Sequence, residues 1–221
     1  MTGFAIDKSF FDVYLRKDKS IGDKQMPEFE VVFPMAQKNG TSYPLPWHKS
    51  GTRAAPESLI TLPEPLPQEF GVGIWFKPYH TEHEPYRKIV ELNRETYSPS
   101  NRYRIFVRAA PNSRQLNFVQ VSEGDLVNAV SSDVITAGVV IGVYCHFKGT
   151  SFIPYYRIGD GSIVQMSEVT GTAPVEDITK IHLGHLDGEN HANAILSTFA
   201  LHTGDDIDAE KYLSNIPGVS G

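Results

Sequence analysis

The chain has 221 residues, of which 40% are hydrophobic and 21% charged, a composition typical of one large globular domain or one domain with an appendage. Its formal net charge of −6 argues against a basic surface for nucleic acid or anionic membrane, and its single cysteine, Cys145, excludes an intrachain disulfide framework. No apolar stretch is long enough to span a bilayer, and no signal-peptide pattern is present at residue 1. We therefore expect a protein that is made in the cytoplasm and is not inserted into a membrane.

Residues 1–56 are expected to form an extended N-terminal arm, followed by a single β-sandwich domain over residues 57–221. Seven prolines lie between residues 34 and 67, which excludes a helix and permits only extended or edge segments. Within them, Asn39-Gly40 is typical of a hairpin turn. Because the arm is also rich in apolar side chains, we expect it to pack along its own domain or against a partner subunit.

The stretch FGVGIWFKPY, residues 70–79, alternates strictly between two faces of an expected strand. Its even positions are predicted to face a core: Phe70, Val72, Ile74 and Phe76. The opposite face carries Gly71, Gly73 and Trp75, where the glycines leave room for a ligand or for the chain's own arm. Trp75 and the adjacent Tyr79 are therefore candidate ligand-binding residues, because sugars stack on aromatic faces.

Short segments with a period of two continue along the chain, separated by glycine-containing turns such as Glu123-Gly124. These expected strands are residues 102–108, 116–121, 139–147, 152–158, 180–183 and 195–201. One short helix is expected near the end, where Asp208 is a good N-cap and the sequence SNIPG stops the helix. Many short alternating strands with glycine turns predict an antiparallel β-sandwich or jelly roll.

Three segments resemble the LamG-like, concanavalin A-like jelly roll when taken in order. They are FGVGIWFKP, GVVIGVYCHFKGTSFIPYYRIGDG and ILSTFALHTGDDIDAEKYL, and the resemblance covers about residues 57–216. It implies an all-β antiparallel sandwich that binds a glycan or glycoprotein.

One strand carries a possible binding face. Arg102, Arg104 and Arg108 share one side of it, with Phe106 among them. Guanidinium groups beside an aromatic ring suit acidic sugars or a carboxylate-bearing partner. A plain solvated outer face is the alternative interpretation of the same pattern.

Calcium is the one cofactor that the sequence suggests. Asp187, Glu189 and Asn190 lie in one loop, and Asp205-Asp206 lie in another, with the oxygen ligands that calcium prefers. The alternative is that these are ordinary turn residues. The histidines near His182 and His80 do not have the spacing of a zinc site on a strand.

Catalysis is not expected. A retaining glycosidase needs two carboxyl groups about 5–5.5 Å apart, and the nearest pattern, Glu28-Phe29-Glu30, lies in the arm. We therefore expect a non-catalytic structural or adhesion protein with a lectin-like sandwich, such as a phage decoration, fibre or tail component. It would associate with other structural subunits through the arm, as a homo-oligomer or larger assembly, and could bind surface glycans. The alternatives are a free-standing lectin module and a glycan-degrading hydrolase or lyase.

Overall fold

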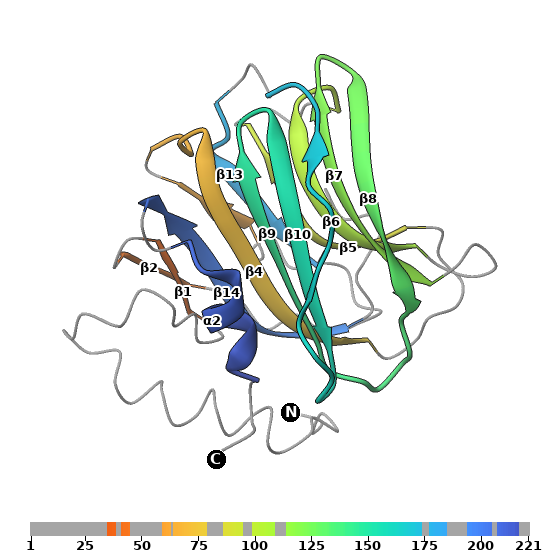
Figure 1. The fold of residues 1–221 in the computed structure, drawn as a ribbon. Coiled ribbons are helices and arrows are strands. Elements are labelled where there is room, and N and C mark those ends of the chain that lie inside the picture. Colours follow the sequence, from red (N-terminus) through yellow and green to blue (C-terminus); the bar gives the residue numbers. More distant parts are fainter. Residues whose placement is uncertain are drawn as a thin grey trace.

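The computed structural model contains two β-sheets packed face to face, with a short helix on the outside of one of them (Figure 1). The two sheets form an all-β sandwich in which all strand pairings but one are antiparallel, as the sequence predicts. The structure describes residues 35–38, 41–44, 59–62, 64–78, 86–94, 99–108, 114–173, 177–184, 194–204 and 207–216.

Sheet A is built around strand β4, which pairs with β9 on one side and β14 on the other. In spatial order its strands are β11 (Val164–Gln165), β10 (Ser151–Ile158), β9 (Ile141–Lys148), β4 (Glu69–Pro78), β14 (Ala194–Thr203), β1 (Met35–Lys38) and β2 (Thr41–Pro44). A further strand, β12 (Val169–Thr170), also pairs with β10. The pairings are antiparallel except that of β1 with β14, which is parallel.

Sheet B is a six-stranded antiparallel sheet. In spatial order its strands are β3 (Leu59–Thr61), β13 (Lys180–Leu183), β5 (Tyr86–Asn93), β6 (Arg102–Arg108), β7 (Gln115–Ser122) and β8 (Asp125–Val134). Strand β8 is therefore one edge of this sheet, at the right of Figure 1.

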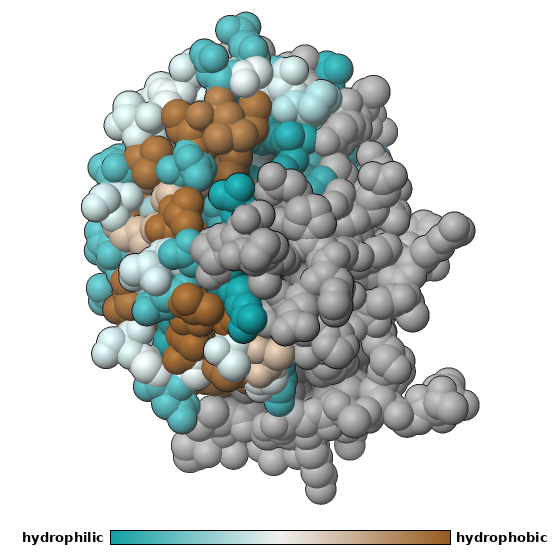
Figure 2. Space-filling view, turned by 90° about the vertical axis from the view of Figure 1, so that its right-hand side faces the viewer, coloured by the Kyte–Doolittle hydropathy of each residue, from teal (hydrophilic) through white to brown (hydrophobic). Residues whose placement is uncertain are grey.

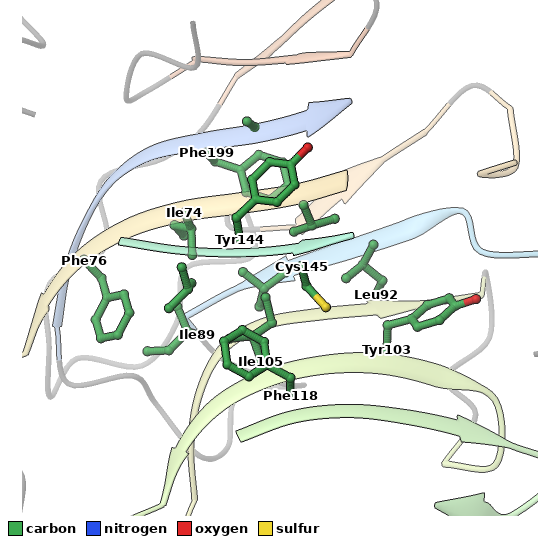
Figure 3. Packing of buried hydrophobic residues seen from close by; sticks show 14 of the residues in the cluster. Ile74, Phe76, Ile89, Leu92, Tyr103, Ile105, Phe118, Tyr144, Cys145 and Phe199 are labelled. Carbon is green, nitrogen blue, oxygen red and sulfur yellow. The ribbon is translucent and has the colours of Figure 1, made fainter. Parts of the chain in front are cut away.

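The core lies between the two sheets, where alternate residues of each strand meet. The even positions of β4 are all at most 1% exposed, which confirms the core prediction for this strand. Figure 3 shows Ile74 and Cys145 from sheet A facing Ile105 and Phe118 from sheet B. Since these side chains belong to one contiguous cluster, the two sheets share a single core.

Five strands were not among those expected from the sequence, namely the short β3, β11 and β12 and the longer β5 and β8. In β5 the alternation is broken by a β-bulge between Lys88 and Val90, so Ile89 and Val90 are both buried. In β8 the apolar side chains of Leu126 and Val130 lie on the exposed outer face rather than in the core. Period-two alternation predicts a strand only where the apolar side chains occupy one face and that face is buried. Strand β5 lacks regular alternation, and in β8 the face that carries Leu126 and Val130 is exposed.

The predicted hairpin and helix are both present. Strands β1 and β2 pair with Lys38 opposite Thr41, as expected for a two-residue connection. Helix α2 (Ala209–Ser214) begins after Asp208, whose side chain accepts a hydrogen bond from the backbone N–H of Lys211 at 2.9 Å. In the part of the chain that the structure describes, no helix is long and apolar enough to cross a membrane.

Candidate functional site on the outer face of sheet B

The glycine face of β4 is covered by the chain's own helix α2, on the outside of sheet A. Trp75 is fully buried, and its ring centroid lies 6.5 Å from that of Tyr212 in α2. A Cβ atom added to Gly73 would lie 2.5 Å from the Tyr212 ring, and one added to Gly142 would lie 2.7 Å from Trp75. The glycines therefore make room for aromatic rings that close this face, and Trp75 is placed in the core rather than against a ligand or the arm.

Tyr144 and His202 complete this buried aromatic layer. The Tyr144 hydroxyl and Nδ1 of His202 lie 2.9 Å apart, and both side chains are at most 1% exposed. Burial raises the pKa of Tyr144 well above its usual range, with a smaller contribution from Tyr212. Figure 3 shows the Tyr144 ring on the side of β9 opposite the inter-sheet core. The outer side of sheet A thus forms a second packed layer.

The predicted arginine stripe lies on the other side of the sandwich. The register of β6 turns Tyr103 and Ile105 inward and turns Arg102, Arg104, Phe106 and Arg108 outward, as expected. Tyr103 packs against Phe70 and Phe147 in the core. The structure therefore brings the arginines and Phe106 together and separates them from Trp75.

A buried carboxylate, Glu91 of β5, sits at the centre of this outer face. Its side chain is completely buried, and its Oε2 atom accepts a hydrogen bond from Nε of Arg104 at 2.9 Å. Nζ of Lys88 is 3.5 Å from the same oxygen, and Nη1 of Arg102 is 4.0 Å from Oε1. Three cationic side chains therefore surround one carboxylate, an arrangement that compensates its burial.

The arrangement disfavours the charged form of Lys88. Burial lowers the pKa of Lys88 to about 8, and repulsion from Arg104 and Arg102 adds to this effect while Glu91 opposes it. At neutral pH the amine remains mostly protonated. An additional anion at this face would favour the charged form of Lys88, so the cluster has the electrostatics of an anion-binding site.

An apolar cluster borders the charged one. Phe106, Val119 and Val121 form it on the outer face of β6 and β7, and each is at most 6% exposed. The guanidinium carbon of Arg104 lies 5.8 Å from the centroid of the Phe106 ring, within cation–π range. The face thus combines a fixed guanidinium, an aromatic ring and apolar surface.

Several candidate residues lie outside the described part of the chain. They are Tyr79 and the proposed calcium ligands Asp187, Glu189, Asn190, Asp205 and Asp206. Within the described ranges, no group of three or more histidine, cysteine or acidic side chains could hold a metal ion. The calcium hypothesis therefore stays a prediction.

Glu91 and Lys88 were not recognised as site residues from the sequence. The signal was present in the stretch KIVELN, where one acid interrupts an apolar run. A carboxylate in such a run must be paired if it is buried, because an isolated buried charge is very costly.

The comparisons with known proteins give distant structural likeness. No family model matches the chain, and no curated protein matches it. Solved structures similar to it include the heptameric SAP-like pentraxin of Limulus polyphemus, at 16% identity and a TM-score of 0.46, covering 65% of this chain and 68% of the pentraxin. Galectin-Ib of Xenopus laevis gives 11% identity and a TM-score of 0.42, covering 65% of this chain and 98% of the galectin.

Two further solved structures are matched over less of their own length. Domains LG4-5 of the mouse laminin alpha1 chain give 11% identity and a TM-score of 0.45, covering 70% of this chain and 44% of the laminin chain. A xylan beta-1,4-xylosidase from Bacillus halodurans C-125 gives 9% identity and a TM-score of 0.44, covering 61% of this chain and 28% of the xylosidase. Likeness of this degree assigns neither a family nor a ligand, so LamG-like membership stays a prediction.

Proposed function

We propose that this chain is a non-catalytic binding protein that recognises an anionic ligand, such as an acidic glycan, on the outer face of sheet B. The observation that carries the proposal is the gathering of Lys88, Arg102 and Arg104 around Glu91. Arg102 and Arg104 keep 13% of their side chains exposed, and Arg108 is exposed at the end of the same stripe. These groups would hold the ligand at the rim of the face.

The position of Arg104 supports recognition of a carboxylate or sulfate. Its Nε atom donates to Glu91, which fixes the plane of the guanidinium group. A fixed guanidinium plane loses little conformational entropy when its Nη groups bind a second anion. The Phe106 ring, whose centroid lies 5.8 Å from the guanidinium carbon of Arg104, further restricts that orientation.

Hydrolysis is less well supported by the same site. The described part of this face has a single carboxylate, Glu91, which is engaged by three cations. Glycoside hydrolysis normally requires a second carboxyl group at a defined distance. Non-catalytic binding therefore fits the geometry better than a hydrolase or lyase.

A structural or adhesion subunit, with a phage decoration, fibre or tail component as its most specific form, is the biological setting we propose for this binding. Its support is the proline-rich, apolar composition of residues 34–67, which suits an arm laid across a neighbouring subunit. The strands described within that region belong to the chain's own sheets, with β1 and β2 in sheet A and β3 in sheet B, so a contact with a neighbouring subunit would involve other residues of the arm.

An array of acidic and neutral glycans, probed with and without calcium, tests this function. We expect binding restricted to acidic glycans, weakened about tenfold by Arg104→Lys, which keeps the charge but loses the planar fork. Arg108→Gln should weaken binding, while Lys148→Gln on sheet A should not. Equal binding of neutral glycans, or release of shortened sugars during incubation, would reject the proposal. A requirement for calcium would instead locate binding at the acidic loops.

A further inference from the structure

Strand β8, at the edge of sheet B, carries apolar side chains that are open to solvent. Leu126 is 58% exposed, Val130 41% and Val134 55%, and these are the exposed large hydrophobic residues among those the structure describes. Figure 2 looks at this side of the molecule and shows hydrophobic groups in a column between hydrophilic ones. An exposed apolar edge of this kind is a template for pairing with another strand.

Two of the usual protections of an edge strand, proline and lysine, are absent from β8. Its sequence, DLVNAVSSDV, has no proline and no basic residue, and its two acids stand near the ends. In the described part of the chain, β7 is the only strand with which β8 pairs. Natural edges are normally blunted by lysine, proline or a covering element, so this edge has the properties of an interface.

We propose that a second copy of this chain covers the edge, its β8 strand pairing antiparallel with the first about a two-fold axis at Asn128. In this register Leu126 lies opposite the second copy's Val130, and Asn128 lies opposite its counterpart. Asp125 lies opposite the second copy's Ser131, so no like charges meet. The two six-stranded sheets then continue into one another, and the exposed Leu126 and Val130 become cross-strand pairs, whereas Val134 lies beyond the paired residues 125–131.

The geometry of β8 favours this register over its neighbours. An axis at Ala129 would place Asp125 opposite Asp133 of the other copy, and like charges directly opposite are destabilising. An axis at Val130 would extend the pairing through the bulge between Val130 and Val134, where the ladder with β7 shifts. The axis at Asn128 lies within the regular part of the strand.

The apolar cluster on sheet B is continuous with this edge. Val121 lies opposite Leu126 in the ladder between β7 and β8, and Val119 lies opposite Asn128. Pairing through β8 would therefore place Leu126 and Val130 of both copies between the two apolar clusters. A self-complementary edge of this kind suits an isologous dimer, in which one surface meets itself.

Charge substitution at the axis tests the proposal, because residue 128 would face itself. For the full chain we expect a mass that rises with concentration from 24.6 kDa toward twice that value in sedimentation. Asn128→Asp and Asn128→Lys should each weaken self-association at least about tenfold through like-charge repulsion. An equimolar mixture of the two variants should restore association. Gln165→Asp and Gln165→Lys, at an exposed position of the edge strand β11 of sheet A, are the matched controls.

Three results would overturn the inference: a monomer at all concentrations, association unchanged by both charges at 128, or a mixture that fails to associate. Cross-linking gives a second test that does not depend on the charged variants folding. Asn128→Cys should form a disulfide between copies on mild oxidation, since paired residues on antiparallel strands lie within disulfide range. Gln165→Cys should not, and equal cross-linking of the two variants would reject the proposed axis.

Discussion

At the scale of single residues, the central feature is the paired burial of Glu91. A carboxylate with no exposed surface is tolerable only because Arg104, Lys88 and Arg102 lie within 4.0 Å of it. The stripe of arginines read from β6 is therefore held in place by an acid on the neighbouring strand. The same contacts fix the orientation of Arg104, on which the proposed ligand site depends.

Neutralising Glu91 should therefore be costly. We expect Glu91→Gln to lower the free energy of unfolding by about 3 kcal/mol, because it leaves buried cations without their counter-charge. Glu168→Gln removes an exposed acid whose nearest cation, Lys148, is 4.0 Å away, and it should cost under about 0.5 kcal/mol. Urea unfolding measures both variants. Similar losses for the two would show that the cluster on sheet B does not depend on its carboxylate.

At the scale of elements, helix α2 closes the outer face of sheet A. The helix has only six residues, so its stability comes from its cap and from packing rather than from its own hydrogen bonds. Tyr212 and Leu213 are buried, with Tyr212 against Trp75 and Tyr144. The rings fit because Gly73 and Gly142 have no side chains beneath them.

Removing the N-cap of α2, Asp208, should weaken the packing of this helix on the outer face of sheet A. We expect Asp208→Ala to cost about 1 kcal/mol, since it leaves the N–H of Lys211 without its acceptor. With Trp47 changed to Phe, the fluorescence of Trp75 should shift to the red and be quenched more readily by acrylamide. Glu210→Ala, an exposed position in the same turn, should change the fluorescence much less. Unaltered quenching in Asp208→Ala would mean that α2 does not depend on this cap.

At the scale of the whole molecule, one core joins both sheets. Cys145 lies at its centre, fully buried on β9, and burial raises the pKa of its thiol well above the usual value. Long-range pairings such as β4 with β14 and β3 with β13 close both sheets with residues far apart in the chain. Neither sheet can therefore bury its inner face without the other.

The single cysteine, Cys145, can report whether the two sheets unfold together as one cooperative unit. We expect Cys145 to react with a thiol reagent only through global unfolding, so its protection should equal the free energy from urea denaturation. The urea dependence of labelling should also match the equilibrium m-value. Labelling that is much faster, with a weak urea dependence, would show that the sheets separate locally and that the sandwich is not one cooperative unit.

The sequence by itself determined the sandwich class, most of its strands, the hairpin at Asn39-Gly40 and the helix capped by Asp208. These features follow from alternation, turn residues and capping chemistry, which act over a few neighbouring residues. The outward direction of Arg102, Arg104 and Phe106 was predictable for the same reason.

Only the tertiary structure decided what covers each face. Alternation shows that Trp75 lies opposite the core of β4, but not that Tyr212, 137 positions later in the chain, packs on it. Alternation also shows which face of β6 carries the arginines. It does not show their pairing with Glu91, which depends on the register of β5 against β6. Strand β8 was not predicted because Leu126, Val130 and Val134 point outward, and edge position is a property of the whole sheet rather than of any local pattern.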